Sequence, residues 1–261
     1  MSPRAAPRLW EVDAARTAAI AMMVVYHVGY DLSLVGPGVP IDPFSGAWQA
    51  LQIACGSTFL FVVGVSLTIA NARGRARGLA GWALYRRHLR RAAEVGAGAL
   101  AVTAVTWVAF GDDYVRFGIL HCIAAAMLIG PLLVRLGPLN LLLALAVLIG
   151  GLQLMLGPHS DAPGLFLVGA RVPGGVGIDW YPVLPWLAPF LVGLAAGRAL
   201  YPGGARGAWG RRLPSPAWAR PLGAPGRHAL PIYLVHQPVL VALVAAALAL
   251  GGAQVSLSGI G

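Results

Sequence analysis

The sequence predicts an all-α fold: a polytopic membrane helix bundle of about seven transmembrane helices, with a cytoplasmic N-terminus. Three observations support this prediction. Of the 261 residues, 58% are hydrophobic and only 11% are charged, whereas soluble domains carry about 25% charged residues. Apolar segments long enough to cross a bilayer recur along the chain, and arginines gather in alternate connections between them. An ordinary soluble domain is therefore excluded.

Each predicted helix approaches the roughly 20 mostly apolar residues that a hydrocarbon core of about 30 Å requires. The first and last contain polar residues, the third follows an arginine-rich stretch, and the sixth follows a loop rich in glycine and proline. We interpret residues 1–251 as one integral membrane domain and residues 252–261 as a flexible tail. The predicted helices are 14–36, 48–71, 92–110, 117–136, 140–156, 184–201 and 229–250.

The arginines predict the orientation of the bundle. All 19 basic residues are arginine, and with seven crossings all but Arg116 and Arg171 lie on one side. Cytoplasmic loops carry such an excess, so this side is predicted to be cytoplasmic. The net charge of +10 is then explained by basic loops that interact with lipid headgroups. We expect no nucleic-acid partner, and the oligomeric state stays open.

A histidine and an aspartate lie one helical turn apart in the first segment, within "MMVVYHVGYDL". His27 and Asp31 are about 6 Å apart along the helix axis, and charged groups at such depth cost roughly 2.5–3.5 kcal/mol on insertion scales. An aspartate so placed can accept the ring N–H and stabilise an imidazolium. We favour a functional pair, and the alternative is a structural hydrogen bond that packs two helices together.

Two further histidines fall inside predicted helices. His121 lies about one turn inside the outer surface, where it could approach the level of His27, or simply meet interfacial water. His236 precedes Gln237 and Pro238 in "YLVHQP", and it could instead bond a backbone carbonyl that the proline leaves free. Soluble-enzyme motifs such as HExxH, GxSxG and the Walker loop are absent from the sequence.

An ordered set of motifs extends over roughly residues 8–245. The motifs are "RLWEVDAARTAAIAMMVVYHVGYDL", "STFLFVVGVSLTIA", "RRHLRRAAEV", "FGILHCIAAAMLIG", "YPVLPWLAPFLVGLAAGR" and "GRHALPIYLVHQPVL". Through them the chain resembles the bacterial membrane proteins related to the catalytic domain of heparan-α-glucosaminide N-acetyltransferase, and "YLVHQP" is shared with the wider clan of transmembrane acyltransferases. The opening departs from the family pattern, because Thr17 follows Arg16 where a glycine is usual.

The resemblance implies a multi-pass protein of the bacterial inner membrane that transfers an acyl group. The donor would be cytoplasmic acetyl-CoA or another acyl-CoA, and the acceptor an amine or hydroxyl of an extracytoplasmic glycan or amino sugar. We expect no metal. His27 would act as base or transient acyl acceptor, with Asp31 orienting it and His121 nearby.

The same resemblance suggests where the two substrates bind. Arginines suit the phosphates of CoA, and we expect the donor at Asp13, Arg16, Arg86, Arg87, Arg90, Arg91 and His236. Asp13 and Arg16 alone would also fit a solvated ion pair. The external loop 157–182 would bind the acceptor, or be an ordinary loop. Its candidate residues, with one from the next helix, are Asp179, Trp180, Tyr181 and Trp186.

Two other classes of function remain open from the sequence. Histidines on separate helices can be axial haem ligands, and a Soret band in the purified protein would support that class. A transporter or flippase for a glycan or lipid-linked substrate would use the polar residues as a path, although the chain lacks visible internal repeats. Substrate flux without release of CoA would support transport.

Overall fold

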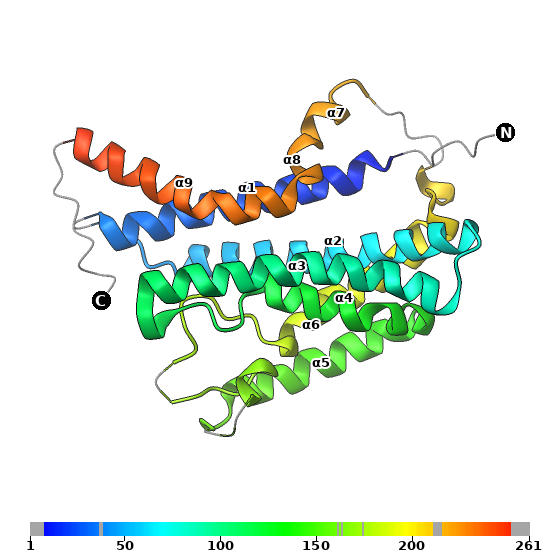
Figure 1. Ribbon diagram of the computed structural model, residues 1–261, viewed down its shortest axis with the longest axis horizontal. Helices are drawn as coiled ribbons and strands as arrows, with labels where there is room; N and C mark the ends of the chain where they lie inside the picture. The colour runs from blue at the N-terminus through cyan, green and yellow to red at the C-terminus, as the bar shows by residue number, and fades with distance from the viewer. Residues whose placement is uncertain are drawn as a thin grey trace. The chain divides into compact units, whose positions relative to one another are not determined.

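The computed structural model describes residues 8–36, 39–160, 162, 164–173, 175–210 and 216–251, and the predicted tail at 252–261 lies outside them. Within these ranges the regular secondary structure is helical, apart from one isolated β-bridge between Phe117 and Trp180 (Figure 1). The long helices are α1 (Trp10–Val35), α2 (Gly46–Ala76), α3 (Gly81–Phe110), α4 (Ile119–Leu133), α5 (Leu139–Leu156), α6 (Val183–Leu200) and α9 (Ala229–Leu250). Two short helices, α7 (Ala219–Leu222) and α8 (Ala224–Arg227), precede α9.

Seven helices in the described residues are long and apolar enough to cross a membrane, so the predicted all-α polytopic class is confirmed. The largest difference in bounds is at α3, which begins at Gly81 rather than at residue 92. Its first turns carry the arginine-rich stretch, and arginine, alanine and leucine are good helix formers. Apolarity marks only the part of a helix that lies in lipid, so it missed this extension.

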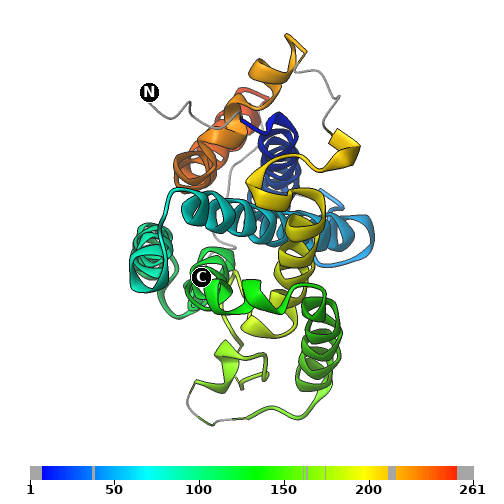
Figure 2. The same ribbon diagram turned by 90° about the vertical axis from the view of Figure 1, so that its right-hand side faces the viewer.

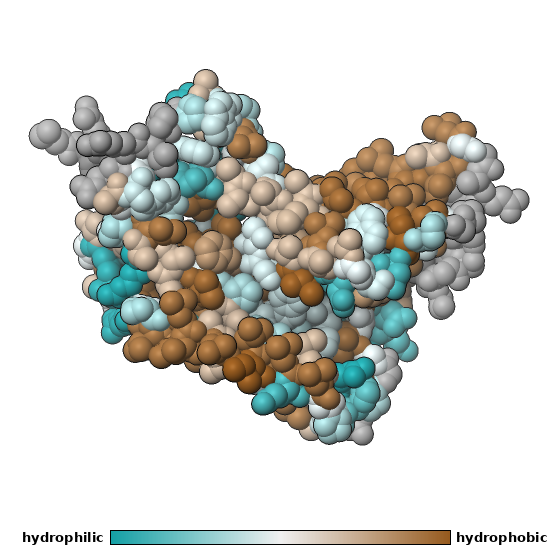
Figure 3. Space-filling view, turned by 180° about the vertical axis from the view of Figure 1, so that it is seen from behind, coloured by the Kyte–Doolittle hydropathy of each residue, from teal (hydrophilic) through white to brown (hydrophobic). Residues whose placement is uncertain are grey.

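Large apolar side chains lie on the outside of the helices, as a lipid environment requires. Figure 3 shows such side chains over much of the face that it draws. On α5 the exposed large apolar residues are Leu139, Leu141, Leu142, Leu145, Leu148, Ile149, Leu152, Leu154 and Leu156.

The chain forms two compact units, to which both α1 and α2 contribute. The first unit comprises residues 1–12 and 60–217, and the second comprises residues 13–59 and 218–261. Within the first unit α5 lies beside α6 and α3 beside α4 (Figure 1 and Figure 2). The single domain over 1–251 stays a prediction.

Small residues let α2 and α6 approach closely in the first unit. A Cβ atom on Gly193 would lie 2.1 Å from the carbonyl oxygen of Phe61, and one on Gly64 would lie 2.2 Å from that of Phe190. Gly193 and Gly197 have the GxxxG spacing that brings helix backbones together in membranes. The Phe190 side chain fills the adjoining core, with no exposed surface.

The second unit has an apolar core made by α1, α9 and the first half of α2. Ile20, Met23 and Cys55 are buried in it, with Ile232 and Tyr233 packed against them. This core fixes one face of α1 against α9 just before the polar residues of both helices.

Candidate functional site

Two histidine rings lie against each other in the second unit. His27 on α1 and His236 on α9 meet edge to face, with ring centroids 4.7 Å apart and an interplanar angle of 79°. His236 is buried, whereas His27 is partly exposed. His27 is therefore the more exposed residue of the pair.

Hydrogen bonds to the backbone indicate where the proton of each ring lies. Nδ1 of His27 lies 2.9 Å from the carbonyl oxygen of Met23, and Nδ1 of His236 contacts the carbonyl oxygen of Tyr233. A carbonyl only accepts, so in each neutral ring Nδ1 carries the proton and Nε2 keeps its lone pair. The Nε2 atom of His236 is buried without a hydrogen-bond partner among the described residues. The geometry thus leaves basic nitrogens available for proton transfer.

Asp31, one turn beyond His27 on α1, is bonded to α9. Its Oδ1 accepts a hydrogen bond of 2.6 Å from Nε2 of Gln237, and the residue is 1% exposed. The direct bond expected from the His27 ring to Asp31 is not formed, because Nδ1 of His27 donates to Met23. Asp31 therefore joins α1 to α9, and its part in catalysis stays a prediction.

Two polar atoms of this cluster lack partners in the part of the chain that the structure describes. They are Oδ2 of Asp31 and Oε1 of Gln237, both buried. Buried polar atoms are nearly always satisfied, and an exception points to a functional group, a water or a ligand. Together with the His236 ring, these atoms mark a polar site inside apolar helices.

Aromatic rings surround the two histidines. Tyr30 contacts His27 edge-on with centroids 6.5 Å apart, and Tyr233 lies 5.2 Å from His236. Phe44 packs edge-on against Tyr30 at 6.1 Å. Such an apolar surround lowers the local dielectric and strengthens every polar contact within it.

The N-terminal end of α1 is held by the residues that open the family motif. Asp13 and Arg16 form the predicted i,i+3 ion pair, with 2.7 Å between Oδ1 and the guanidinium. The Thr17 hydroxyl donates to the carbonyl oxygen of Asp13 and accepts the backbone N–H of Gly226 at 3.0 Å. The threonine that departs from the family pattern thus ties α8 to α1.

His121 belongs to the first unit and is held by two hydrogen bonds. Its Nδ1 accepts the backbone N–H of Gly118 at 3.2 Å, so Nε2 carries the proton and faces the Thr103 hydroxyl at 3.3 Å. That hydroxyl donates to the carbonyl oxygen of Val115. These contacts give His121 a structural task at the start of α4, and its nearness to His27 stays a prediction.

Asp179, a predicted acceptor-binding residue, caps α4 within the first unit. Its Oδ2 accepts the backbone N–H of Ile119 at 3.2 Å, which satisfies one of the free donors at the helix start. Burial raises the pKa of the Asp179 carboxyl to about 6. Gly118 leaves room for this contact, because a Cβ there would lie 2.1 Å from Oδ2.

Each of the three aromatic candidates of the acceptor site contacts another residue of the chain. The Trp180 indole N–H donates to the carbonyl oxygen of Phe166 at 3.0 Å. Tyr181 is 6% exposed, and its ring lies 4.4 Å from that of Trp186. Tyr181 and Trp186 thus pack on each other, and their stacking on a sugar stays a prediction.

Four of the five arginines predicted to bind the donor lie on one exposed stretch of α3, and the fifth, Arg16, lies on α1. Arg90 and Arg91 share Glu94, at 3.3 and 3.6 Å. No such partner appears for Arg86 and Arg87 in the described ranges. A single carboxylate therefore offsets one of the four positive charges of this patch.

Gln237 is the residue of the cluster that sequence reasoning left out of the site. Its partner Asp31 lies 206 positions away, and no local pattern pairs residues at that separation. The one available signal was its place directly after His236 in a motif with a helix-breaking proline.

Fold and site together define a multi-pass, membrane acyltransferase-like protein, with a buried polar cluster among apolar helices. The chain belongs to the family described as heparan-alpha-glucosaminide N-acetyltransferase, catalytic, whose model matches residues 8–238. No curated protein and no solved structure matches it.

Proposed function

We propose that this protein is an integral membrane acyltransferase that moves an acetyl or other acyl group from cytoplasmic acyl-CoA to an amine or hydroxyl of an extracytoplasmic sugar. Family membership supports the type of reaction. The observation that carries the proposal is the His27–His236 pair, with Nδ1 of each ring bonded to a backbone carbonyl.

His27 acts as the general base because it is the more exposed residue of the pair and its Nε2 keeps a lone pair. The acceptor N–H or O–H gives its proton to Nε2 as its nitrogen or oxygen attacks the thioester carbonyl. A carbon–nitrogen or carbon–oxygen bond forms, the carbon–sulfur bond breaks, and the imidazolium returns the proton to the leaving thiolate. Met23 holds the ring through Nδ1 throughout.

His236 and the Asp31–Gln237 bond position this base. The edge of one imidazole against the face of the other limits how the His27 ring turns. The bond between Asp31 and Gln237 keeps α9 beside α1. Rigid support of this kind matters because small displacements of a catalytic group lower rates steeply.

The proposal is tested with purified protein in lipid nanodiscs, labelled acetyl-CoA and a panel of amino-sugar oligosaccharides. Label transfer and release of the CoA thiol are measured together. We expect His27→Ala to lower transfer about 10²–10⁴-fold, the usual span for a general base. The matched control is His159→Ala, since this histidine is exposed in the external loop.

Two results contradict the proposal. A folded His27→Ala variant that transfers label at the wild-type rate removes His27 from the chemistry. Wild-type protein that moves the oligosaccharide across a sealed bilayer without releasing CoA belongs to the transporter class instead.

A further inference from the structure

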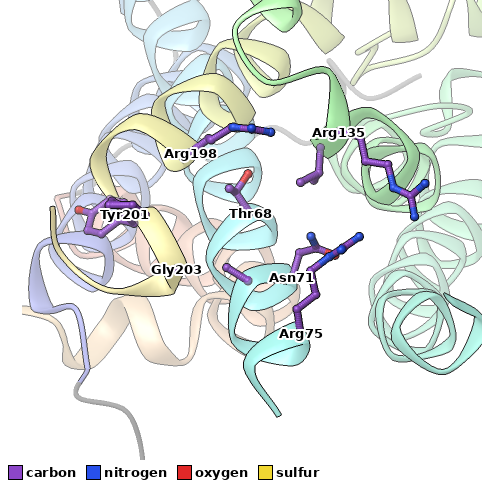
Figure 4. Close-up of a pocket in the computed structure, with 10 residues that line it drawn as sticks. Thr68, Asn71, Arg75, Arg135, Arg198, Tyr201 and Gly203 are labelled. Atoms are coloured by element: carbon purple, nitrogen blue, oxygen red, sulfur yellow. The ribbon is translucent and has the colours of Figure 1, made fainter. Parts of the chain in front are cut away.

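A pocket in the first unit is lined by three arginines from three different helix ends. It has a volume of about 390 Å³. Arg75 comes from the last turn of α2, Arg135 from the 3-10 turn Val134–Leu136 that follows α4, and Arg198 from the last turn of α6. Figure 4 shows the three side chains around one space. All three helix ends face the side that the arginine distribution predicts to be cytoplasmic.

The positive charge of this pocket is not offset by the residues that the structure describes. No acidic residue lines it, and none of the three arginines forms an ion pair or hydrogen bond there. Three of the acidic residues form ion pairs outside this pocket, with Arg16, Arg90 and Arg206. Three like charges around one space repel one another, and a bound anion would relieve that repulsion.

The inner wall of the pocket offers neutral polar groups. Asn71 lines the pocket and is 8% exposed. Thr68, one turn earlier on α2, donates its hydroxyl to the carbonyl oxygen of Leu194 and keeps its lone pairs. Amide and guanidinium donors over one cavity are the groups that bind phosphate oxygens.

A glycine leaves space for one of the arginines. Gly137 has a φ of +57°, a conformation that other residues rarely adopt, and a Cβ there would lie 3.3 Å from the Arg198 guanidinium. The backbone at the end of the 3-10 turn thus leaves room for the head group of Arg198 to lie beside it.

We propose that this arginine pocket is a binding site for a phosphate group of a larger ligand. Three guanidinium groups can bind a phosphate through paired N–H···O bonds. The volume suits a phosphate or diphosphate with its nearest atoms, the rest of the ligand extending outside. Two molecules that meet this surface carry such a group: the nucleotide end of CoA, and an anionic phospholipid. The first source rests on the proposed function, and the second does not.

A competing role for these arginines is general attraction to the membrane surface. Arginine at the end of a transmembrane helix extends to the headgroups and interacts favourably with the helix dipole. Arg77 is one such residue, exposed just beyond the end of α2 and outside the pocket lining. Saturable binding that needs the pocket arginines, and not Arg77, distinguishes a site from a charged surface.

The experiment uses the whole protein and two probes. CoA is titrated into protein in nanodiscs of neutral phosphatidylcholine, and retention of phosphatidylglycerol is followed by native mass spectrometry from detergent. The variants are Arg75→Gln, Arg135→Gln and Arg198→Gln, singly and together, with Arg77→Gln as the matched control. Arg198→Lys keeps the charge but loses the paired geometry. Size-exclusion profile and melting temperature show that each variant is folded.

For at least one probe we expect each single substitution to weaken binding about three- to tenfold. The combined variant should lose it, Arg198→Lys should keep part of it, and Arg77→Gln should change little. Retention of phosphatidylglycerol alone supports the pocket and moves the donor site elsewhere. The pocket is not a phosphate site if the combined variant binds both probes like the wild type, or if Arg77→Gln weakens binding equally. Loss of transfer in His27→Ala, measured separately, shows whether the proposed function stands.

Discussion

Gln237 donates a hydrogen bond of 2.6 Å to Asp31, so two residues 206 positions apart hold α9 to α1 within the second unit. Asp31→Ala would leave the Gln237 amide without this acceptor, and we expect it to lower the free energy of unfolding by about 1–3 kcal/mol. Asp31→Asn retains an acceptor oxygen and should cost less. Thermal unfolding in detergent micelles measures both changes.

A double-mutant cycle tests whether this bond is one unit. Asp31→Ala combined with Gln237→Leu should lower the free energy of unfolding by clearly less than the sum of the single changes. In the double variant neither polar group of the bond remains buried without its partner. Additive losses would mean that the two side chains act independently, and the bond would then have no part in joining α1 to α9.

The ring contact between His27 and His236 separates two roles for His236. As the positioning partner of His27, it should affect the rate of transfer, so we expect His236→Ala to lower kcat about tenfold or more with little change in KM for acyl-CoA. A higher KM at unchanged kcat would instead favour the donor contact that the sequence suggested. Steady-state kinetics over a range of acyl-CoA concentrations resolve the split.

The helices could be predicted from the sequence because lipid imposes one simple rule on each: about 20 apolar residues in a row. The partners of the polar residues could not. Asp31 was expected to accept a hydrogen bond from the His27 ring, one turn away. The ring instead donates to the carbonyl oxygen of Met23, four residues before His27. In a helix the backbone competes with any side chain at that spacing.

The positions of the arginines along the sequence likewise did not reveal which of them lie together in the fold. Their distribution in the sequence predicted a cytoplasmic side, and with it a surface for phosphates. Arg75, Arg135 and Arg198 come from separate helices, and only the packing of those helices brings them around one cavity. The consecutive arginines on α3 were more conspicuous in the sequence, yet Arg90 and Arg91 share Glu94.

We expect the Asp179 carboxyl, in the loop before α6, to make stability depend on pH. Burial raises its pKa from 3.8 to about 6, so the ionised form costs more in the folded than in the unfolded protein. Its contribution is most favourable below the unfolded pKa and is lost as the pH rises through about 6. We expect stability to increase by the order of 1–3 kcal/mol as the pH falls from 7.5 toward 5.

Asp179→Asn tests that dependence directly. The amide oxygen can still accept the Ile119 N–H without carrying a charge, so the variant should be at least as stable at pH 7.5 and flatter across this range. Asp112→Asn, at an exposed position of the same unit, is the control that should keep the wild-type slope. An Asp179→Asn variant with an unchanged slope would assign the pH dependence to another group.

The bidentate pair of Arg206 and Glu11 should stabilise the first unit more than any surface ion pair. Both Glu11 oxygens accept guanidinium N–H groups, at 2.9 and 2.7 Å, and the side chains are only 15% and 17% exposed. Arginine stays charged at neutral and mildly alkaline pH, and the hydrogen bond to Glu11 raises the pKa of Arg206 further. Glu11→Gln should therefore cost about 1–3 kcal/mol with little change between pH 6 and 9.

The exposed pair of Arg90 and Glu94 is the matched comparison, since its side chains are 85% and 44% exposed. Glu94→Gln should cost less than about 1 kcal/mol. Adding Arg206→Gln to Glu11→Gln should restore part of the loss, because the buried guanidinium is no longer left without its carboxylate. Thermal unfolding at low and high salt measures all three, and salt should affect Glu94→Gln more than Glu11→Gln. Equal losses for the two glutamates would show that the Arg206–Glu11 pair stabilises the fold no more than a solvated pair does.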